Sequence, residues 1–213
     1  MKLFTILTGL LTKHRILELH LDKSKTVIST WHSQKTVGKE LEDAGFSVVY
    51  DDEPPAPYNN QVNRQAKAIM NGIQYAKAQG ATHILRVRTD MYCNDLAKLN
   101  DLLMSKYEDS YKLAVLCGIL IHVPHYYYLD VLFFGRIELF STLFGTQQEP
   151  TDRRSPEIFW AETRLQSPAT TSQDYRSIFN FFGLDCKETG IDWYWYRLNH
   201  WKKLNYTDPA YWY

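Results

Sequence analysis

Short apolar runs alternate with longer amphipathic ones along the chain, and this pattern predicts strands and helices in turn. Apolar and β-branched residues cluster at 3–8, 26–30 and 46–50, and a turn or a polar loop follows each cluster, as is typical of strands. Between the second and third clusters, residues 35–44 are polar with apolar positions at helical spacing, and Gly45 follows them. This part of the chain therefore predicts a strand–helix–strand unit.

A longer amphipathic segment follows at residues 63–79. Its apolar residues recur at intervals of three and four, which places them on one face of a helix that stops at Gly80. Residues 83–88 then predict a strand, and Asp90 lies just beyond its end. Because ligands of open α/β sheets bind outside the carboxyl ends of the strands, Asp90 is where a functional carboxylate is expected.

The second half continues the alternation. Strands are expected at 113–123 and 126–134, with Asp130 interrupting the latter, and a polar loop at 147–155. Pro156 and Glu157 suit the first turn of a helix. Helices are expected in this half at 96–103, 137–144 and 156–165. Beyond residue 170 the pattern defines no element clearly. The alternation predicts an α/β fold with a mixed, mostly parallel central sheet flanked by helices.

Composition narrows the class of protein. The 213 residues and 25.0 kDa suit one domain, 1–213, and the absence of a polar tail after Tyr213 also suits one domain of a longer protein. A formal net charge of zero argues against a nucleic-acid partner. Three widely spaced cysteines fit neither a disulfide framework nor a zinc site, which favours a cytoplasmic protein. No apolar stretch approaches the ~20 residues of a transmembrane segment.

The ends of the first three predicted strands carry the candidate chemistry. If the sheet is parallel, Thr8 and Gly9, then Trp31, then Asp51 and Asp52 lie side by side and form a cleft. The chain has no GxGxxG motif and no P-loop, so a glycine-rich cradle for phosphates is absent. A bound diphosphate would need another counter-charge, and Mn²⁺ or Mg²⁺ on carboxylate oxygens is expected to supply it.

Several stretches together resemble a known family. The residues Asn63-Arg64-Gln65, the helix that follows them, and the run Ile-Leu-Arg-Val-Arg-Thr-Asp-Met at 84–91 resemble the donor-binding core of GT-A glycosyltransferases. The strand ending in Ser-Thr-Trp at 29–31, the segment 128–135 and Pro156-Glu157 resemble WavE-type lipopolysaccharide and capsule synthesis proteins. Small viral glycosyltransferase domains share this resemblance, which covers residues 3 to about 165.

This resemblance implies a GT-A-like (Rossmann-like) fold in which residues 1–95 bind a nucleotide-sugar donor and residues 96–213 form the acceptor half. It implies transfer of a sugar from a UDP-sugar to a glycan hydroxyl. Asp90 would bind the metal ion, and His200 resembles a late histidine that completes the coordination in some GT-A enzymes. The residues expected to bind the donor are Thr8, Gly9, Trp31, Arg64, Arg88, Thr89 and Asp90.

The chain departs from the family signature at one position. The usual motif is Asp-x-Asp, whereas here Arg88 holds the first position. A cation cannot make the contacts of that aspartate, so Arg88 would touch a phosphate or pair with a carboxylate. Only one of the two usual carboxylates, Asp90, then remains.

Asp130 and Glu157 are the candidate catalytic residues. A carboxylate such as Asp130 within an apolar run is costly unless it is paired or functional. Glu157 would act as a base or a sugar ligand, although glutamate in a first helical turn often serves the helix alone. Asp90 could likewise be only a turn former, and Arg64 only a surface cation.

Two other functions remain open. A sugar-nucleotidyltransferase should carry a glycine-rich, basic loop after its first strand, and residues 9–13 are a poor version of one. A non-catalytic carbohydrate-binding domain would explain the aromatic residues between Trp193 and Tyr213, but not the surroundings of Asp90.

Overall fold

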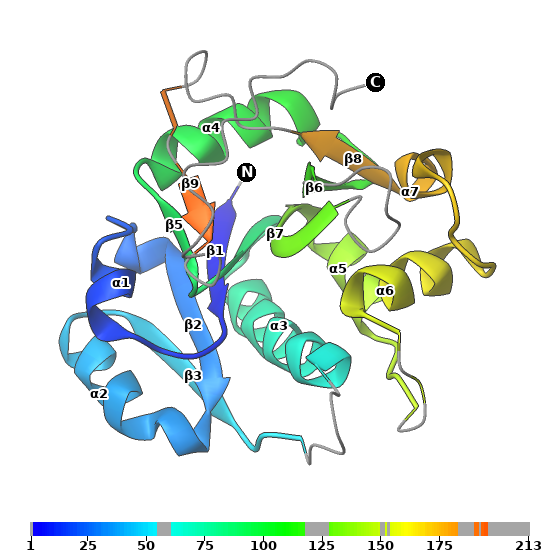
Figure 1. The fold of residues 1–213 in the computed structure, drawn as a ribbon. Coiled ribbons are helices and arrows are strands. Elements are labelled where there is room, and N and C mark those ends of the chain that lie inside the picture. The colour runs from blue at the N-terminus through cyan, green and yellow to red at the C-terminus, as the bar shows by residue number, and fades with distance from the viewer. Residues whose placement is uncertain are drawn as a thin grey trace.

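The computed structural model describes residues 2–54, 61–117, 128–149, 152, 154–182 and 190–191, and the backbone of 193–195. Within these ranges seven strands form one mixed sheet in the order β3-β2-β1-β4-β7-β6-β8 (Figure 1). A second sheet pairs β5 (Met91–Cys93) with β9 (Trp193–Trp195). The strands of the main sheet are β1 (Leu3–Thr8), β2 (Thr26–Trp31), β3 (Ser47–Asp51), β4 (His83–Arg88), β6 (Leu113–Cys117), β7 (Tyr128–Arg136) and β8 (Phe179–Phe182).

The direction of the strands brings their functional ends together. β1 pairs in parallel with β2 and with β4, and β2 pairs in parallel with β3, so four carboxyl ends meet at one edge. β7 runs antiparallel to β4, with Val87 opposite Leu132, and therefore begins at this same edge. The predicted mixed, mostly parallel α/β sheet is confirmed, and so is the side-by-side placement of the first three strand ends.

Helices cover both faces of the sheet, and each face has its own apolar core. On one face a Cβ at Gly72 of α3 would come within 2.4 Å of Ile6 Cγ2, so this helix packs closely on β1. Figure 1 shows α3 beside α5 and α6. The helices of this face are α3 (Gln61–Ala78), α5 (Ile137–Phe144), α6 (Pro156–Leu165) and α7 (Ser172–Ile178), and those of the other are α1 (Lys13–Leu17), α2 (Lys35–Asp43) and α4 (Leu96–Tyr107).

The structure corrects some details of the sequence prediction. β7 begins at Tyr128 and runs to Arg136, whereas the strand was expected at 126–134, and it accommodates Asp130 because this carboxylate is hydrogen-bonded on both oxygens within the fold. The short elements α1, β5, α7 and β8 were not predicted. Residues 118–127 and most of the aromatic C-terminal segment lie outside the described residues. Among the described helices, none is both long and apolar enough to cross a bilayer.

Candidate active site

A clasp between the ends of β1 and β4 forms the floor of the site. The backbone N–H of Thr89 donates to the Thr8 carbonyl at 3.0 Å, and the Thr89 hydroxyl donates to the Leu10 carbonyl at 2.7 Å. Gly9 lies between these contacts with φ +131°, and a Cβ there would come within 2.6 Å of Thr89 Oγ1. Only glycine fits both the backbone angle and the close approach. The predicted residues Thr8, Gly9 and Thr89 are therefore together.

Arg86 lies beneath this floor and is 1% exposed. Its guanidinium donates to Thr8 Oγ1 at 2.9 Å, to Gln65 Oε1 at 3.1 Å and to the backbone carbonyl of Asp130. Burial lowers the pKa of Arg86 below its ordinary value. One cation thus joins β1, β4, β7 and α3 at the carboxyl edge of the sheet. The family resemblance did not assign a role to Arg86 or to Gln65.

Arg88, two residues beyond Arg86 on β4, links two carboxylates. Its Nε and Nη2 donate to the two oxygens of Asp90 at 2.9 and 2.7 Å, and its Nη1 donates to Asp130 Oδ1 at 2.8 Å. The side chains of Arg88, Asp90 and Asp130 are 13%, 19% and 6% exposed. Although burial opposes it, the charges of Asp130 and Asp90 hold the pKa of Arg88 above its ordinary value. Gln65 Nε2 donates to the other Asp130 oxygen at 2.6 Å.

Glu157 adds a third carboxyl group to this region. The Tyr128 hydroxyl at the start of β7 donates to the Glu157 carbonyl at 2.9 Å, which ties the first turn of α6 to the edge of the sheet. Burial, and then the charge of Asp130, raise the pKa of the Glu157 carboxyl to about 8. The two carboxyl groups therefore have different surroundings, since Asp130 is paired with Arg88, whereas burial dominates at Glu157.

The described residues do not fit a preformed metal site. No three His, Cys, Asp or Glu side chains among them are grouped as metal ligands, and both oxygens of Asp90 are held by Arg88. A divalent ion takes carboxylate oxygens as ligands, so it would have to displace Arg88 from Asp90. The second predicted ligand, His200, lies outside the described residues.

The other predicted donor-binding residues lie along the same edge but outside the cluster around Arg88. Trp31 ends β2 and is buried, and Arg64 on α3 forms an ion pair with Glu53 at 3.2 Å. Asp51, at the end of β3, accepts from Asn71 Nδ2 at 2.6 Å and pairs with Lys67 at 3.0 Å. The four parallel strand ends thus present a row of polar and charged groups, as expected from the sequence.

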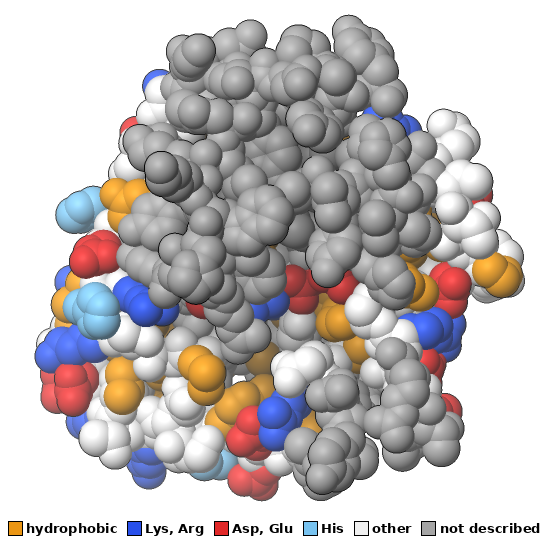
Figure 2. All heavy atoms as spheres, in the orientation of Figure 1, with side chains coloured by type: hydrophobic (Ala, Val, Ile, Leu, Met, Phe, Trp, Pro, Cys, Tyr) orange, Lys and Arg blue, Asp and Glu red, His pale blue; other side chains and the backbone are white. Residues whose placement is uncertain are grey.

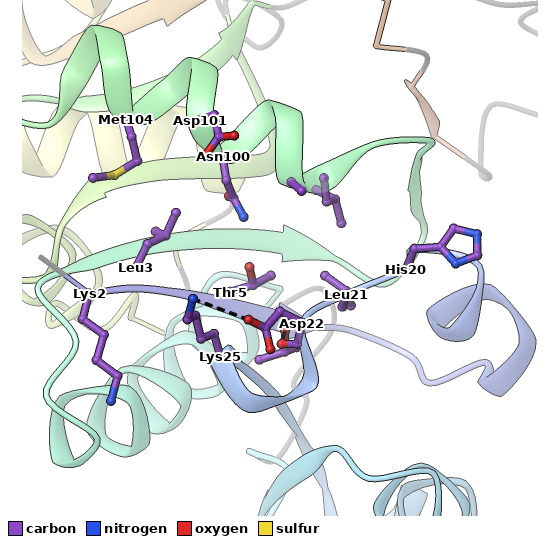
Figure 3. A pocket seen from close by; sticks show the side chains of 13 residues that line it. Lys2, Leu3, Thr5, His20, Leu21, Asp22, Lys25, Asn100, Asp101 and Met104 are labelled. Carbon is purple, nitrogen blue, oxygen red and sulfur yellow. Dashed lines mark hydrogen bonds and ion pairs between the residues drawn. The ribbon is translucent and has the colours of Figure 1, made fainter.

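A separate cavity of about 350 Å³ lies at the opposite end of the strands (Figure 3). It is bordered by the start of β1, by Lys25 before β2 and by α4, from which Asn100 extends toward β1. Asp22 and Lys25 pair at 3.5 Å on its rim. This cavity is remote from the carboxyl edge and contains none of the predicted site residues.

Acidic and basic side chains both lie on the surface shown in Figure 2. Figure 2 shows acidic and basic side chains interspersed over the coloured part of one face, with neither sign dominant. This arrangement agrees with the zero net charge, and the coloured part of that face shows no basic track for a phosphodiester backbone.

Comparison with known proteins identifies solved structures that have a similar fold. No family model matches the chain, and no curated protein matches it significantly. A cytidylyltransferase from Leptospira borgpetersenii has a similar structure, with TM-score 0.52, 14% identity, and coverage of 87% of this chain and 77% of that one. HddC from Yersinia pseudotuberculosis, complexed with GMP-PN, gives TM-score 0.50 and 12% identity over 94% and 96% of the two chains.

A glycosyltransferase involved in glycosylation of the major capsid of PBCV-1 is also similar, with TM-score 0.44 and 14% identity over 87% of this chain and 83% of that one. At these identities the likeness concerns the fold. Two of the similar structures, each with a TM-score of 0.52, are nucleotidyltransferases. This chain has a Rossmann-like α/β fold, which it shares with these structures.

Proposed function

We propose that this protein transfers a sugar from a UDP-sugar to a hydroxyl group of a glycan. The observation that carries the proposal is the group formed by Arg86, Arg88, Asp90 and Asp130 where the parallel strands end. When the bond between the sugar and the diphosphate breaks, negative charge builds on the leaving diphosphate. A fixed positive charge at that point stabilises the transition state. In this proposal residues 1–95 bind the donor, and residues 96–213 bind the acceptor.

The source of that charge was expected from the sequence to be Mn²⁺ or Mg²⁺ at Asp90. Because the described residues do not fit a preformed metal site, no step of the proposal depends on a metal ion. Arg88, which stays protonated beside Asp130, is the cation that the chain itself provides at this position.

The two candidate catalytic carboxylates receive different roles. In an inverting transfer, a base must take the proton of the acceptor hydroxyl, and the pKa of an effective base lies near the working pH. Glu157, with its pKa raised to about 8, meets this condition. Asp130 accepts hydrogen bonds from Arg88 and Gln65 on its two oxygens, so its proposed role is to position Arg88.

Release of UDP from a panel of UDP-sugars, measured with and without glycan acceptors and Mn²⁺, tests this proposal. Glu157→Gln should lower kcat by about 10²- to 10⁴-fold while the KM for the donor stays the same, because the base acts in the chemical step. Glu162→Gln is the matched control, since Glu162 lies on the same helix and pairs with Arg154. If the folded wild type released UDP from no donor under any of these conditions, the proposal would be wrong.

Nucleotidyl transfer is the second candidate, because nucleotidyltransferases are among the structural neighbours. The segment between β1 and α1 supports glycosyl transfer over it. Leu11 in this segment is buried and donates its backbone N–H to Gln34 Oε1 at 2.7 Å, while Lys13 pairs with Glu40 at 3.1 Å. These contacts hold Leu11 and Lys13 against α2 and the residues before it, so the segment does not form a basic loop around a triphosphate. A non-catalytic carbohydrate-binding domain would release no nucleotide at all.

A further inference from the structure

Arg88 occupies the two atoms through which Asp90 would bind a metal ion. The guanidinium holds Asp90 Oδ1 and Oδ2 at 2.9 and 2.7 Å, side by side, in a bidentate pair. This geometry is the strongest that arginine forms with an oxyanion, and phosphate offers the same spacing of oxygens. The contact with Asp90 therefore has the shape of the contact that a donor diphosphate would make.

The other contacts of Arg88 keep it in place if Asp90 moves. Nη1 donates to Asp130 Oδ1 at 2.8 Å, and Asp130 is itself held by Gln65 at 2.6 Å and, through its carbonyl, by Arg86. Asp130 is more deeply buried than Asp90, with 6% of its side chain exposed against 19%. Asp90 is thus the carboxylate nearer to solvent, and the one that an incoming anion can replace.

Charge balance favours an anion over a divalent cation at this point. Among the described residues, two guanidiniums, Arg86 and Arg88, lie beside the carboxylates of Asp90 and Asp130, and beside Glu157, whose raised pKa favours the neutral form. A divalent cation at Asp90 would break the pair with Arg88 and add two positive charges beside two guanidiniums in a poorly hydrated site, where like charges repel strongly. A diphosphate would instead take the place of Asp90 on Arg88 and keep the guanidinium paired.

We propose that Arg88 itself binds the diphosphate of the donor, exchanging Asp90 for phosphate oxygens, and that donor binding requires no divalent metal ion. The proposal rests on the proposed function, because it states how the same site holds the donor. It gives Asp90 a role opposite to that of a metal ligand. Asp90 competes with the diphosphate for Arg88, so removing its charge should strengthen nucleotide binding.

Calorimetry of UDP binding to the full chain tests this inference. The metal-stripped wild type is titrated in excess EDTA and again with Mn²⁺, and we expect the two Kd values to agree within about threefold. Asp90→Asn should bind UDP at least as tightly as the wild type. Arg88→Gln should raise Kd by about tenfold to hundredfold, and Arg88→Lys by less, since lysine keeps the charge without the bidentate fork.

Arg136→Gln is the matched control, because it removes one positive charge at the far end of β7, where Arg136 is 42% exposed. Its Kd should equal that of the wild type. Circular dichroism confirms folding, and if Arg88→Gln does not fold, the EDTA titration and Asp90→Asn decide the question.

Two other outcomes would overturn either this inference or the proposed function. UDP binding that appears only with Mn²⁺ and disappears in Asp90→Asn would overturn the inference and leave the proposed function intact. Absence of UDP binding by the folded wild type, with and without Mn²⁺, would overturn the proposed function and this inference with it.

Discussion

Replacing Arg86 with methionine should destabilise the protein by about 3 kcal/mol, a large part of the 5–15 kcal/mol typical of a domain. Arg86 is 1% exposed and joins four elements at the carboxyl edge through Thr8, Gln65 and the carbonyl of Asp130. Methionine offers no donor to the acceptors that Arg86 would leave behind. The loss should therefore exceed that of an exposed arginine.

The magnitude follows from these contacts. The Thr8 hydroxyl can rotate to another partner, but the Gln65 amide oxygen and the Asp130 carbonyl are fixed, and each buried acceptor without a donor costs about 1–3 kcal/mol. Two such acceptors give about 2–6 kcal/mol in total. The Phe133 ring lies 5.7 Å from the guanidinium carbon, and methionine keeps the packing on this ring. Methionine also removes the cost of burying a charge. The expected loss of stability therefore lies in the lower half of this range.

Urea unfolding followed by tryptophan fluorescence measures this loss, provided that the m-value does not change. Arg154→Met is the control, because Arg154 is 41% exposed and its pairs with Asp152 and Glu162 should contribute less than about 1 kcal/mol. If the two variants lost the same small amount of stability, Arg86 would not hold the strand ends together as described.

Two further predictions concern neighbouring residues. Because burial and Asp130 raise the pKa of Glu157 to about 8, the folded chain keeps a proton that the unfolded chain releases above about pH 4.3. Stability should fall as the pH rises from about 4.3 to 8, and Glu157→Gln should remove this part of the slope in urea titrations; an unchanged slope would contradict the assignment. Gly9→Ala should lower Tm by ~5 °C or more, because φ is +131° and the new Cβ would meet Thr89 Oγ1 at 2.6 Å. Gly80→Ala, with φ +78° and open space around it, should lower Tm by less, and equal losses would exclude the steric contact as the cause.

The sequence predicted the main sheet except β8, and its longer helices, because their patterns are local. The run at residues 83–88 and the periodic segment that became α3 show their burial directly in the order of apolar residues. The expected parallel arrangement correctly placed Thr8, Trp31 and Asp51 at one edge of the sheet. Short elements such as α7 were missed, although Thr171 and Asp174 form a capping box at its start.

The network around Asp130 could not be predicted, because its partners are distant in sequence. Asp130 was expected to be paired or functional within an apolar run, but only the folded chain brings Arg88 and Gln65 to its two oxygens. One signal was available for Arg86, since a charged residue between Leu85 and Val87 in a buried strand requires partners. The identity of those partners depends on how β7 and α3 pack, which sequence periodicity does not encode.

The most direct test of the central claim identifies the nucleotide product by phosphorus NMR. One reaction contains the protein, a UDP-sugar and a glycan acceptor, and the other contains UTP and a sugar 1-phosphate. Glycosyl transfer predicts UDP in the first mixture and no pyrophosphate in the second. Pyrophosphate in the second mixture, with no UDP in the first, would show nucleotidyl transfer and contradict the account.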